Sequence, residues 1–246
     1  MIFNLFKSKP TLKELIPKGF VDIHSHILPG IDDGAKNIEE SLKLISEMKK
    51  LGTSEIIATP HTYPGLYDNQ TSDIYDSYKK LKNEKITDIK IKYASEYFLG
   101  KYLIQLAEKK SLLSIGKKHV LVEMSMHQET LNLHDIIYNL LTNGYTPILA
   151  HPERYMFYHD NIDKLLKLKK IGCKFQLNLL STVGYYGRNI SNSADIMLKK
   201  DLFSFVGSDV HNMSHIISHN NKIKSSQIKK IKNLFINHQN NLKLIR

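Results

Sequence analysis

The chain has 246 residues, of which 41% are hydrophobic, and a formal net charge of +11 from 35 basic and 24 acidic residues. No stretch approaches the roughly 18 consecutive apolar residues of a membrane-spanning helix. The single cysteine, Cys173, excludes an intrachain disulfide, and Leu179 stands six positions later, where cysteine-based phosphatases carry arginine. Most basic residues are lysines scattered along helices, as on a solvated surface or one suited to an anionic protein partner. No cluster of arginine and aromatic residues indicates nucleic-acid binding.

Residues 1–19 form an N-terminal extension that leads into the first predicted strand. Their apolar part is too short and too poor in small residues for a secretory signal, so we expect a cytoplasmic protein. Ile2, Phe3, Leu5 and Phe6 lie among lysines in this extension. We expect them to pack on the floor of the following domain; contact with a membrane surface or a membrane-bound partner is the alternative.

Short apolar strands alternate with helical patterns from residue 19 onward. Between the first two strands, Asn37 can cap a helix over residues 38–50, and Gly52 follows as a stop signal. Helical patterns over residues 133–144 and 161–172 likewise lead directly into strands. The predicted strands span residues 19–24, 54–61, 88–96, 119–124, 146–151, 173–178 and 202–209.

This alternation predicts parallel strands joined by right-handed helical crossovers. Seven such units follow one another without a linker rich in proline, glycine or serine. We therefore expect residues 20–246 to form one α/β domain, closed as a barrel rather than divided in two.

Side chains of the types that bind metals stand at the carboxyl ends of these strands. In a parallel barrel the strand ends share one rim, where such folds place their chemistry. Six of the seven predicted strands end in such a residue, which is too many to attribute to chance. The rim set comprises His24, His26, His61, Glu96, Glu123, His151, Asn178, Asp209 and His211. The other histidines are interpreted as structural; they are His119, His127, His134, His159, His215, His219 and His238.

The stretch FVDIHSHILPGIDDGAK adds Asp32 and Asp33 to the two histidines that follow the first strand. Histidines and carboxylates gathered on one rim are costly to bury unless divalent cations compensate them. A mixed set without thiolate favours manganese, iron or zinc. The candidate ligands are too many for one ion, and a carboxylate such as Glu96 can bridge two. The sequence therefore predicts a site for several metal ions.

The charge of such a site suggests its substrate. Three divalent ions and four carboxylates would leave a charge of about +2, which matches a phosphate dianion. Arg154 follows His151 by three residues and would lie on the same rim, where its guanidinium can bind a phosphoryl oxygen. A salt bridge to Glu153 or to another neighbour is the alternative interpretation. The four carboxylates are Asp33, Glu96, Glu123 and Asp209.

The motifs DIHSHILPGIDDGAK, TPH, ASEYF, LVEMS, AHPERY and GSDVHN resemble, in order and spacing, those of the polymerase and histidinol phosphatase (PHP) superfamily. Within it they are similar to the metal-dependent protein-tyrosine phosphatases of bacterial capsular and exopolysaccharide loci. The resemblance covers residues 20 to about 213. It implies a distorted (β/α)7 TIM-like barrel of the PHP type with three metal ions, most commonly Mn2+, with Fe or Zn as alternatives.

The resemblance also implies roles for individual residues. Asp209, His211 and Arg154 form the expected catalytic set, and Asp32 matches no ligand position, so it is interpreted as supporting a ligand or as a turn residue. A hydroxide held between metals would attack phosphorus directly. The implied ligands are His24, His26, Glu96 and Asp209 for one ion, Glu96, Glu123 and His151 for a second, and Asp33, His61 and His211 for a third.

The resemblance implies a phosphoric monoester hydrolase acting on phosphotyrosine. The expected substrate is the tyrosine-rich tail of a membrane-associated autokinase that controls polysaccharide export, which would recruit the enzyme to the inner face of the membrane. A small-molecule phosphomonoesterase such as histidinol-phosphate phosphatase is the enzymatic alternative. An inactive, basic scaffold with a PHP-type shell is the non-enzymatic one. An amidohydrolase is disfavoured because Glu123 stands where that class usually has lysine or histidine.

Overall fold

The structure, a computed structural model, describes residues 9–84, 86 and 88–245. Every pair of strands in this part of the chain is parallel, in two sheets of order β1-β2-β4 and β3-β5-β6-β7-β8-β9. The strands are β1 (Phe20–Asp22), β2 (Thr53–Ala58), β3 (His61–Thr62), β4 (Lys90–Tyr93), β5 (Glu96–Phe98), β6 (His119–Glu123), β7 (Thr146–Ala150), β8 (Lys174–Asn178) and β9 (Phe205–Gly207).

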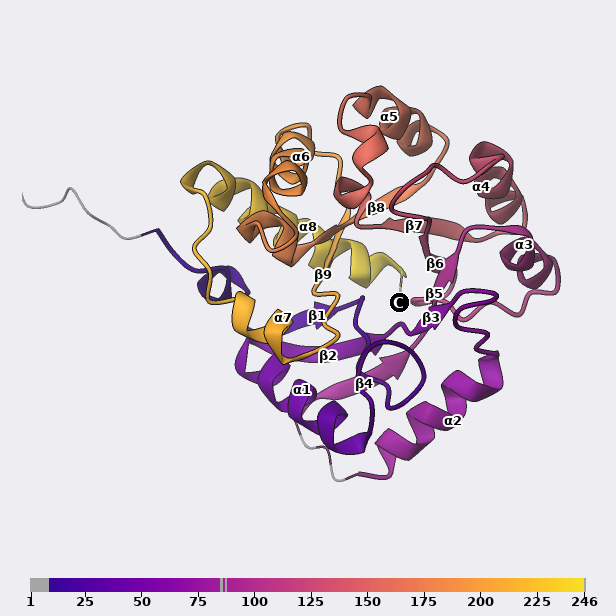
Figure 1. Cartoon of the computed structure of the whole chain (residues 1–246), viewed down its shortest axis with the longest axis horizontal. Helices are drawn as coiled ribbons and strands as arrows, with labels where there is room; N and C mark the ends of the chain where they lie inside the picture. The colour runs from indigo at the N-terminus through magenta and orange to yellow at the C-terminus, as the bar shows by residue number, and fades with distance from the viewer. Residues whose placement is uncertain (1–8, 85, 87, 246) are drawn as a thin grey trace, which may run out of the picture.

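Helices surround the strands, as Figure 1 shows. The helix expected over residues 38–50 is α1, and the Asn37 side chain caps it by accepting a hydrogen bond from the amide of Glu40 at 2.9 Å. The α-helices are α1 (Ile38–Lys50), α2 (Thr71–Lys82), α3 (Lys101–Glu108), α4 (Leu133–Thr142), α5 (Ile162–Lys170), α6 (Arg188–Lys199), α7 (Met213–Ser218) and α8 (Ser225–Ile245).

The two sheets belong to one ring of strands. The segments expected as single strands over residues 54–61 and 88–96 are each divided in two, and Pro60, which has no amide hydrogen to donate, lies at the first break. Hydrogen bonds continue across the breaks, from the Ala94 amide to the Ala58 carbonyl at 2.8 Å and from the Glu96 amide to the Pro60 carbonyl at 3.0 Å.

The ring is completed where the chain beyond β1 meets the chain beyond β9. Ser25 and Val210 form a parallel bridge there, and the His26 amide donates to the Val210 carbonyl at 2.9 Å. In the described part of the chain, seven strand units therefore surround one centre. Figure 1 shows their irregular ring. The expectation of a distorted (β/α)7 barrel is confirmed.

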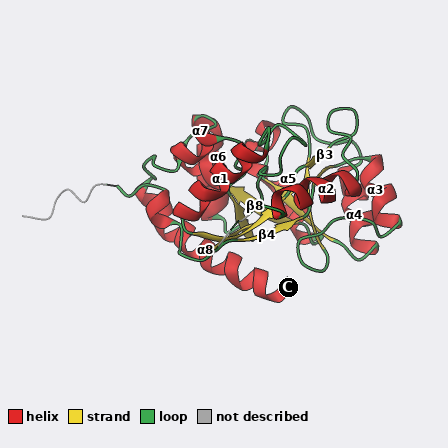
Figure 2. Cartoon of the chain, turned by 90° about the horizontal axis from the view of Figure 1, so that it is seen from below, coloured by secondary structure: helices red, strands yellow, loops and turns green. Residues whose placement is uncertain are grey.

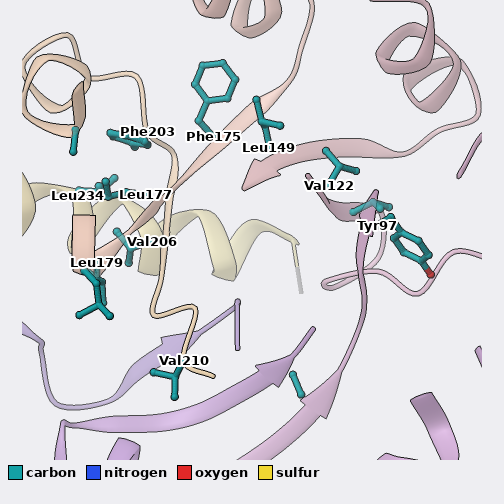
Figure 3. Packing of buried hydrophobic residues seen from close by; sticks show 14 of the residues in the cluster. Tyr97, Val122, Leu149, Phe175, Leu177, Leu179, Phe203, Val206, Val210 and Leu234 are labelled. Carbon is teal, nitrogen blue, oxygen red and sulfur yellow. The ribbon is translucent and has the colours of Figure 1, made fainter. Parts of the chain in front are cut away.

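Two layers of apolar side chains hold the ring together. In β6, Val120 and Val122 belong to the larger cluster between strands and helices, whereas Leu121 belongs to a smaller one. This alternation follows from the period of two in a strand. Figure 3 shows the larger cluster, with Val122, Leu149 and Phe175 on the neighbouring strands β6, β7 and β8.

Helix α8 covers the end of the ring where the strands begin. Its buried His238 donates from Nε2 to the Val21 carbonyl at 2.7 Å and accepts at Nδ1 from the Val206 amide at 3.2 Å. Leu242 is buried with the apolar residues of the smaller cluster. In Figure 2, α8 lies along the lower edge of the molecule and β3 near the upper edge.

The described part of the N-terminal extension packs beside α8. Leu12 and Leu15 are buried, and the Leu12 amide donates to the Asn221 carbonyl at 3.0 Å. The expected packing of Ile2, Phe3, Leu5 and Phe6 falls on residues outside the described part of the chain. The division into residues 1–19 and 20–246 stays a prediction. Among the described helices, none combines the length and the apolar character needed to cross a bilayer.

Candidate metal centre

The predicted rim residues come together at the carboxyl ends of the strands. Six of the nine line a cavity of about 320 Å³ at this end of the ring, and His24, His26 and Asn178 lie outside its lining. Leu121 and Glu123 lie two residues apart on β6, so the strand that buries one in the ring directs the other toward the cavity. The cavity is lined by Asp33, His61, Glu96, Glu123, Met126, His151, Arg154, Tyr186, Asp209, His211, Asn212 and His215.

His24 and His26 are held with the same ring atom facing the same point. Nδ1 of His24 donates to Oε1 of Gln176 at 2.9 Å, and the Gln176 amide is oriented by donating to the Leu177 carbonyl at 2.6 Å. Nδ1 of His26 lies 2.7 Å from Oδ2 of Asp32. Both Nε2 atoms are thereby left to act as ligands, and they lie 3.2 Å apart. Two imidazoles fixed in this way are oriented for a shared cation.

The carboxylates of Glu96 and Asp209 complete this group, but the hydrogen-bonding capacity of Glu96 is left unsatisfied in the described part of the chain. Nε2 of His24 lies 3.1 Å from Oε2 of Glu96 and 3.2 Å from Oδ1 of Asp209. Glu96 is fully buried, yet neither of its oxygens has a hydrogen-bond partner among the described residues. Because a buried carboxylate without partners is costly, this arrangement fits divalent cations between the carboxylates and the imidazoles.

A second group shares Glu96. Nδ1 of His61 lies 2.8 Å from Oε1 of Glu123 and 3.2 Å from Oε2 of Glu96. Nε2 of His151 approaches the other Glu96 oxygen, at 3.3 Å. The family resemblance implied that Glu96 and Glu123 share an ion with His151. In the structure, His61 also lies beside these two carboxylates, and Glu96 is within reach of both histidines.

A third group lies toward solvent. Oδ1 of Asp33 is 3.5 Å from Nε2 of His61 and 3.5 Å from Nε2 of His211. His211 donates from Nδ1 to the Asp209 carbonyl at 2.9 Å, which leaves Nε2 as its ligand atom. His26 completes this group. Asp33, His61 and His211, the residues expected to share one ion, therefore lie together.

The DDG sequence shapes the loop that carries Asp33. Asp32 accepts hydrogen bonds from the amides of Gly34 at 2.9 Å and His61 at 3.1 Å, in addition to that from His26. Gly34 packs against His26 so closely that a Cβ atom at this position would collide with the His26 carbonyl. Asp32 therefore supports His26, and glycine is required beside it.

Two of the candidate ligands have unusual backbone conformations. His151 and Asp209 have φ values of 35° and 53°, in the left-handed region that non-glycine residues seldom adopt. His151 follows directly on β7 and Asp209 lies two residues beyond the end of β9, and both side chains line the cavity. Such strain is typical of functional sites because packing must hold it in place.

The charges in the cluster depend on one another. Burial alone would lower the pKa of His24, but Glu96 and Asp209 raise it to about 9. Burial alone would raise the pKa of Asp209, but His24 and His211 lower it well below its usual value. Burial and the nearby Arg154 lower the pKa of His151 to about 4. Asp209 thus remains ionised and His151 neutral, which are the forms that bind metals.

Arg154 forms one wall of the cavity. Its Nη1 donates to Oδ2 of Asp209 at 2.9 Å, and its guanidinium carbon lies 4.3 Å from the centre of the Tyr186 ring. Asn178 donates to the same Asp209 oxygen at 2.8 Å. The Glu153 carboxylate instead accepts hydrogen bonds from the backbone amide of Asn178 and from the Ser181 hydroxyl. Arg154 therefore pairs with Asp209, not with Glu153, and 21% of its side chain stays exposed.

Sequence reasoning missed several residues of this site. His215, interpreted as structural, lines the cavity and donates from Nδ1 to the Asp209 carbonyl at 2.9 Å. Tyr186 carried no signal because it does not follow a predicted strand. Met126 carried none because methionine is not among the histidine and carboxylate side chains on which the predicted rim rests. Gln176 could have been found, since a polar residue on the same face of β8 as Asn178 contradicts an apolar barrel interior.

A parallel barrel with imidazoles and carboxylates converging at its C-terminal rim defines a metal-dependent hydrolase of the TIM-like barrel class. The sequence model of the family described as "Capsular polysaccharide synthesis, CpsB/CapC" matches residues 20–242. The chain belongs to this family, and the resemblance expected from its motifs is confirmed.

Relatives of known name agree with this assignment. The tyrosine-protein phosphatase CpsB of Streptococcus pneumoniae is 31% identical over 202 residues, covering 78% of this chain and 83% of the relative. The tyrosine-protein phosphatase YwqE of Bacillus subtilis (strain 168) is 29% identical over 197 residues, covering 78% of each chain.

Solved structures extend the comparison to the fold. One match belongs to a pair of structures, YwqE of Bacillus subtilis and CpsB of Streptococcus pneumoniae, which are described as metal-dependent tyrosine phosphatases. It has a TM-score of 0.80 at 26% identity and covers 92% of this chain and 93% of the other. Histidinol phosphate phosphatase from Lactococcus lactis matches with a TM-score of 0.58 at 15% identity, over 86% and 93% of the two chains. The latter likeness concerns the fold alone.

Proposed function

We propose that this chain is a metal-dependent phosphatase that hydrolyses phosphotyrosine in proteins. The observation that carries the proposal is the arrangement around Glu96. The fixed Nε2 atoms of His24 and His26 face this buried carboxylate, whose oxygens have no hydrogen-bond partner among the described residues. The relatives named above, tyrosine-protein phosphatases, supply the reaction.

We propose that the site binds three divalent metal ions, most commonly Mn2+. The nine proposed ligands are imidazoles and carboxylates, a set that suits manganese, iron and zinc. When bound, these ions supply Lewis-acid polarisation of the phosphoryl group and activation of the attacking water. The proposed ligands are His24, His26, Asp33, His61, Glu96, Glu123, His151, Asp209 and His211.

The other groups of the site position the substrate. The guanidinium of Arg154 is fixed between Asp209 and the Tyr186 ring, with part of it exposed to the cavity. We assign to it the binding of a phosphoryl oxygen and the stabilisation of charge in the transition state. A tyrosinate leaves with a pKa near 10, so it needs less protonation than an alkoxide would.

The proposed substrate is the tyrosine-rich tail of a membrane-associated kinase of capsule or exopolysaccharide synthesis, reached from the cytoplasm. The family description supports the link to capsular polysaccharide. The formal charge of +11 favours an acidic phosphopeptide.

The proposal is tested by phosphate release from three substrates: a tyrosine-phosphorylated peptide, histidinol phosphate and a generic aryl phosphate. We expect the peptide to have the highest kcat/KM, and Glu96→Gln to abolish turnover of all three. Preference for histidinol phosphate would favour the small-molecule phosphatase, and no turnover by folded, metal-loaded protein would favour the scaffold.

A further inference from the structure

The excess of positive over negative charge lies almost entirely at the two ends of the chain. Residues 210–246 contain seven basic residues and no acidic one, and residues 1–19 contain four basic residues and one acidic. The 190 residues between them carry 24 basic and 23 acidic residues, so they are nearly neutral. The net charge of +11 therefore belongs almost entirely to the terminal segments.

The fold brings the described parts of these segments to one face. Residues 9–19 pack beside α8, through Leu12 and through a hydrogen bond from Gln239 to the Gly19 carbonyl at 3.2 Å. Asn241 donates to the Ser204 carbonyl at 2.8 Å, just before β9 begins. This face therefore lies where the strands start, opposite the rim that carries the candidate metal centre.

The outward side of α8 carries one stripe of lysines with an apolar residue at its centre. We call this stripe, together with Lys18, the basic floor; it consists of Lys18, Lys229, Lys232, Ile236, Asn240 and Lys243. Its positions on α8 are spaced by three or four residues, so they share one side of the helix. Ile236 is 60% exposed, and the other members are exposed as well.

The lysines of the basic floor have no ion-pair partner in the described part of the chain. The nearby Lys230 differs, because it is paired with Asp201 at 2.8 Å. Glu14, the one acidic residue of the extension, accepts hydrogen bonds from Thr11 instead. Between α8 and the extension lies a cavity of about 440 Å³, which Lys18, Lys232 and Lys243 help to line.

We propose that the basic floor docks on a membrane surface rich in anionic lipids. Unpaired lysines around an exposed aliphatic side chain on one side of a helix match the charged headgroups and the apolar layer beneath them. A nucleic acid fits less well, because the described residues of this face expose neither arginine nor aromatic rings. Docked in this way, the protein directs its catalytic rim away from the bilayer. This inference does not depend on the proposed reaction.

Sedimentation with vesicles tests the proposal with the full chain. We expect binding to vesicles of phosphatidylcholine with about 30% phosphatidylglycerol, none to phosphatidylcholine alone, and weakening as salt rises. Lys232→Glu with Lys243→Glu should lower the partition coefficient by about tenfold or more. Ile236→Ser should lower it less, since it removes the apolar contact alone.

The matched control is Lys80→Glu with Lys109→Glu. These lysines are exposed on α2 and just after α3, have no ion-pair partner among the described residues, and change the net charge by the same amount. We expect this control to bind within about twofold of the unchanged protein, and turnover of a soluble aryl phosphate to be equal in all variants. Equal losses in both double variants, equal binding to neutral vesicles, no binding at all, or tighter binding to polyglutamate than to vesicles would each overturn the proposal.

Discussion

Arg154 and Asp209 form an ion pair at 2.9 Å in which each residue has a second task. The other oxygen of Asp209 faces Nε2 of His24 and His26, at 3.2 and 3.4 Å. One carboxylate thus joins the proposed phosphate-binding group to the proposed metal ligands. The ion pair holds both side chains in place. Substitutions at Arg154 can therefore separate its proposed role in phosphate binding from the proposed role of Asp209 in metal binding.

Replacing Arg154 by lysine keeps the charge but removes the planar, two-pronged group and its stacking on Tyr186. We expect kcat/KM for a phosphotyrosine peptide to fall by about 100-fold while the bound metal content is unchanged. Kinetics and elemental analysis of the same preparation measure both. If the metal content falls with activity, Arg154 acts through Asp209 and not on phosphate.

Replacing Asp32 by asparagine weakens the support of His26 without removing a proposed ligand. Because the carboxylate fixes Nδ1 of His26 at 2.7 Å, we expect metal affinity to drop by about 10- to 100-fold. Titration of metal into stripped protein gives the affinity, and Asp68→Asn, at an exposed position outside helices and strands, serves as the control. An unchanged affinity would show that packing alone orients His26.

His219 predicts a pH dependence of stability. Its side chain is buried, and this burial lowers its pKa to about 4. An unfolded histidine has a pKa near 6.5, so the unfolded chain binds more protons between pH 6.5 and 4, and this contribution to stability is lost as the pH falls through that range. We expect His219→Gln to remove up to about 3 kcal/mol of this dependence.

Urea unfolding of metal-stripped protein at several pH values checks this prediction. The control is His134→Gln, because His134 is exposed on α4. The prediction is wrong if both variants keep the full dependence of the unchanged protein.

His238→Ala removes two hydrogen bonds to the backbones of β1 and β9 and leaves a space beneath the ring. We expect the free energy of unfolding to fall by about 2–4 kcal/mol. Denaturant unfolding with His134→Ala as control measures the loss. A loss below about 0.5 kcal/mol would mean that α8 contributes little to closing the barrel floor.

The sequence was sufficient to predict the strands and the rim because both follow from local pattern. It could not predict the division of the strand at Pro60, since the chain continues in the same direction after the break. Nor did it predict α8 as the floor, because a tail rich in lysine and asparagine resembles a solvated segment. Tyr186 and His215 reach the cavity through tertiary packing, and the pattern of residues at strand ends does not reveal such contacts.

The central claim is that the rim cluster holds the metal ions on which phosphotyrosine hydrolysis depends. The most direct measurement follows phosphate release from a phosphotyrosine peptide as Mn2+ is returned to stripped protein, with bound metal counted in parallel and His151→Ala as a comparison. The proposed function predicts that activity appears together with bound metal, up to three ions per chain, and that His151→Ala binds fewer ions and stays inactive. Activity in the fully stripped protein, or full activity in His151→Ala, would contradict it.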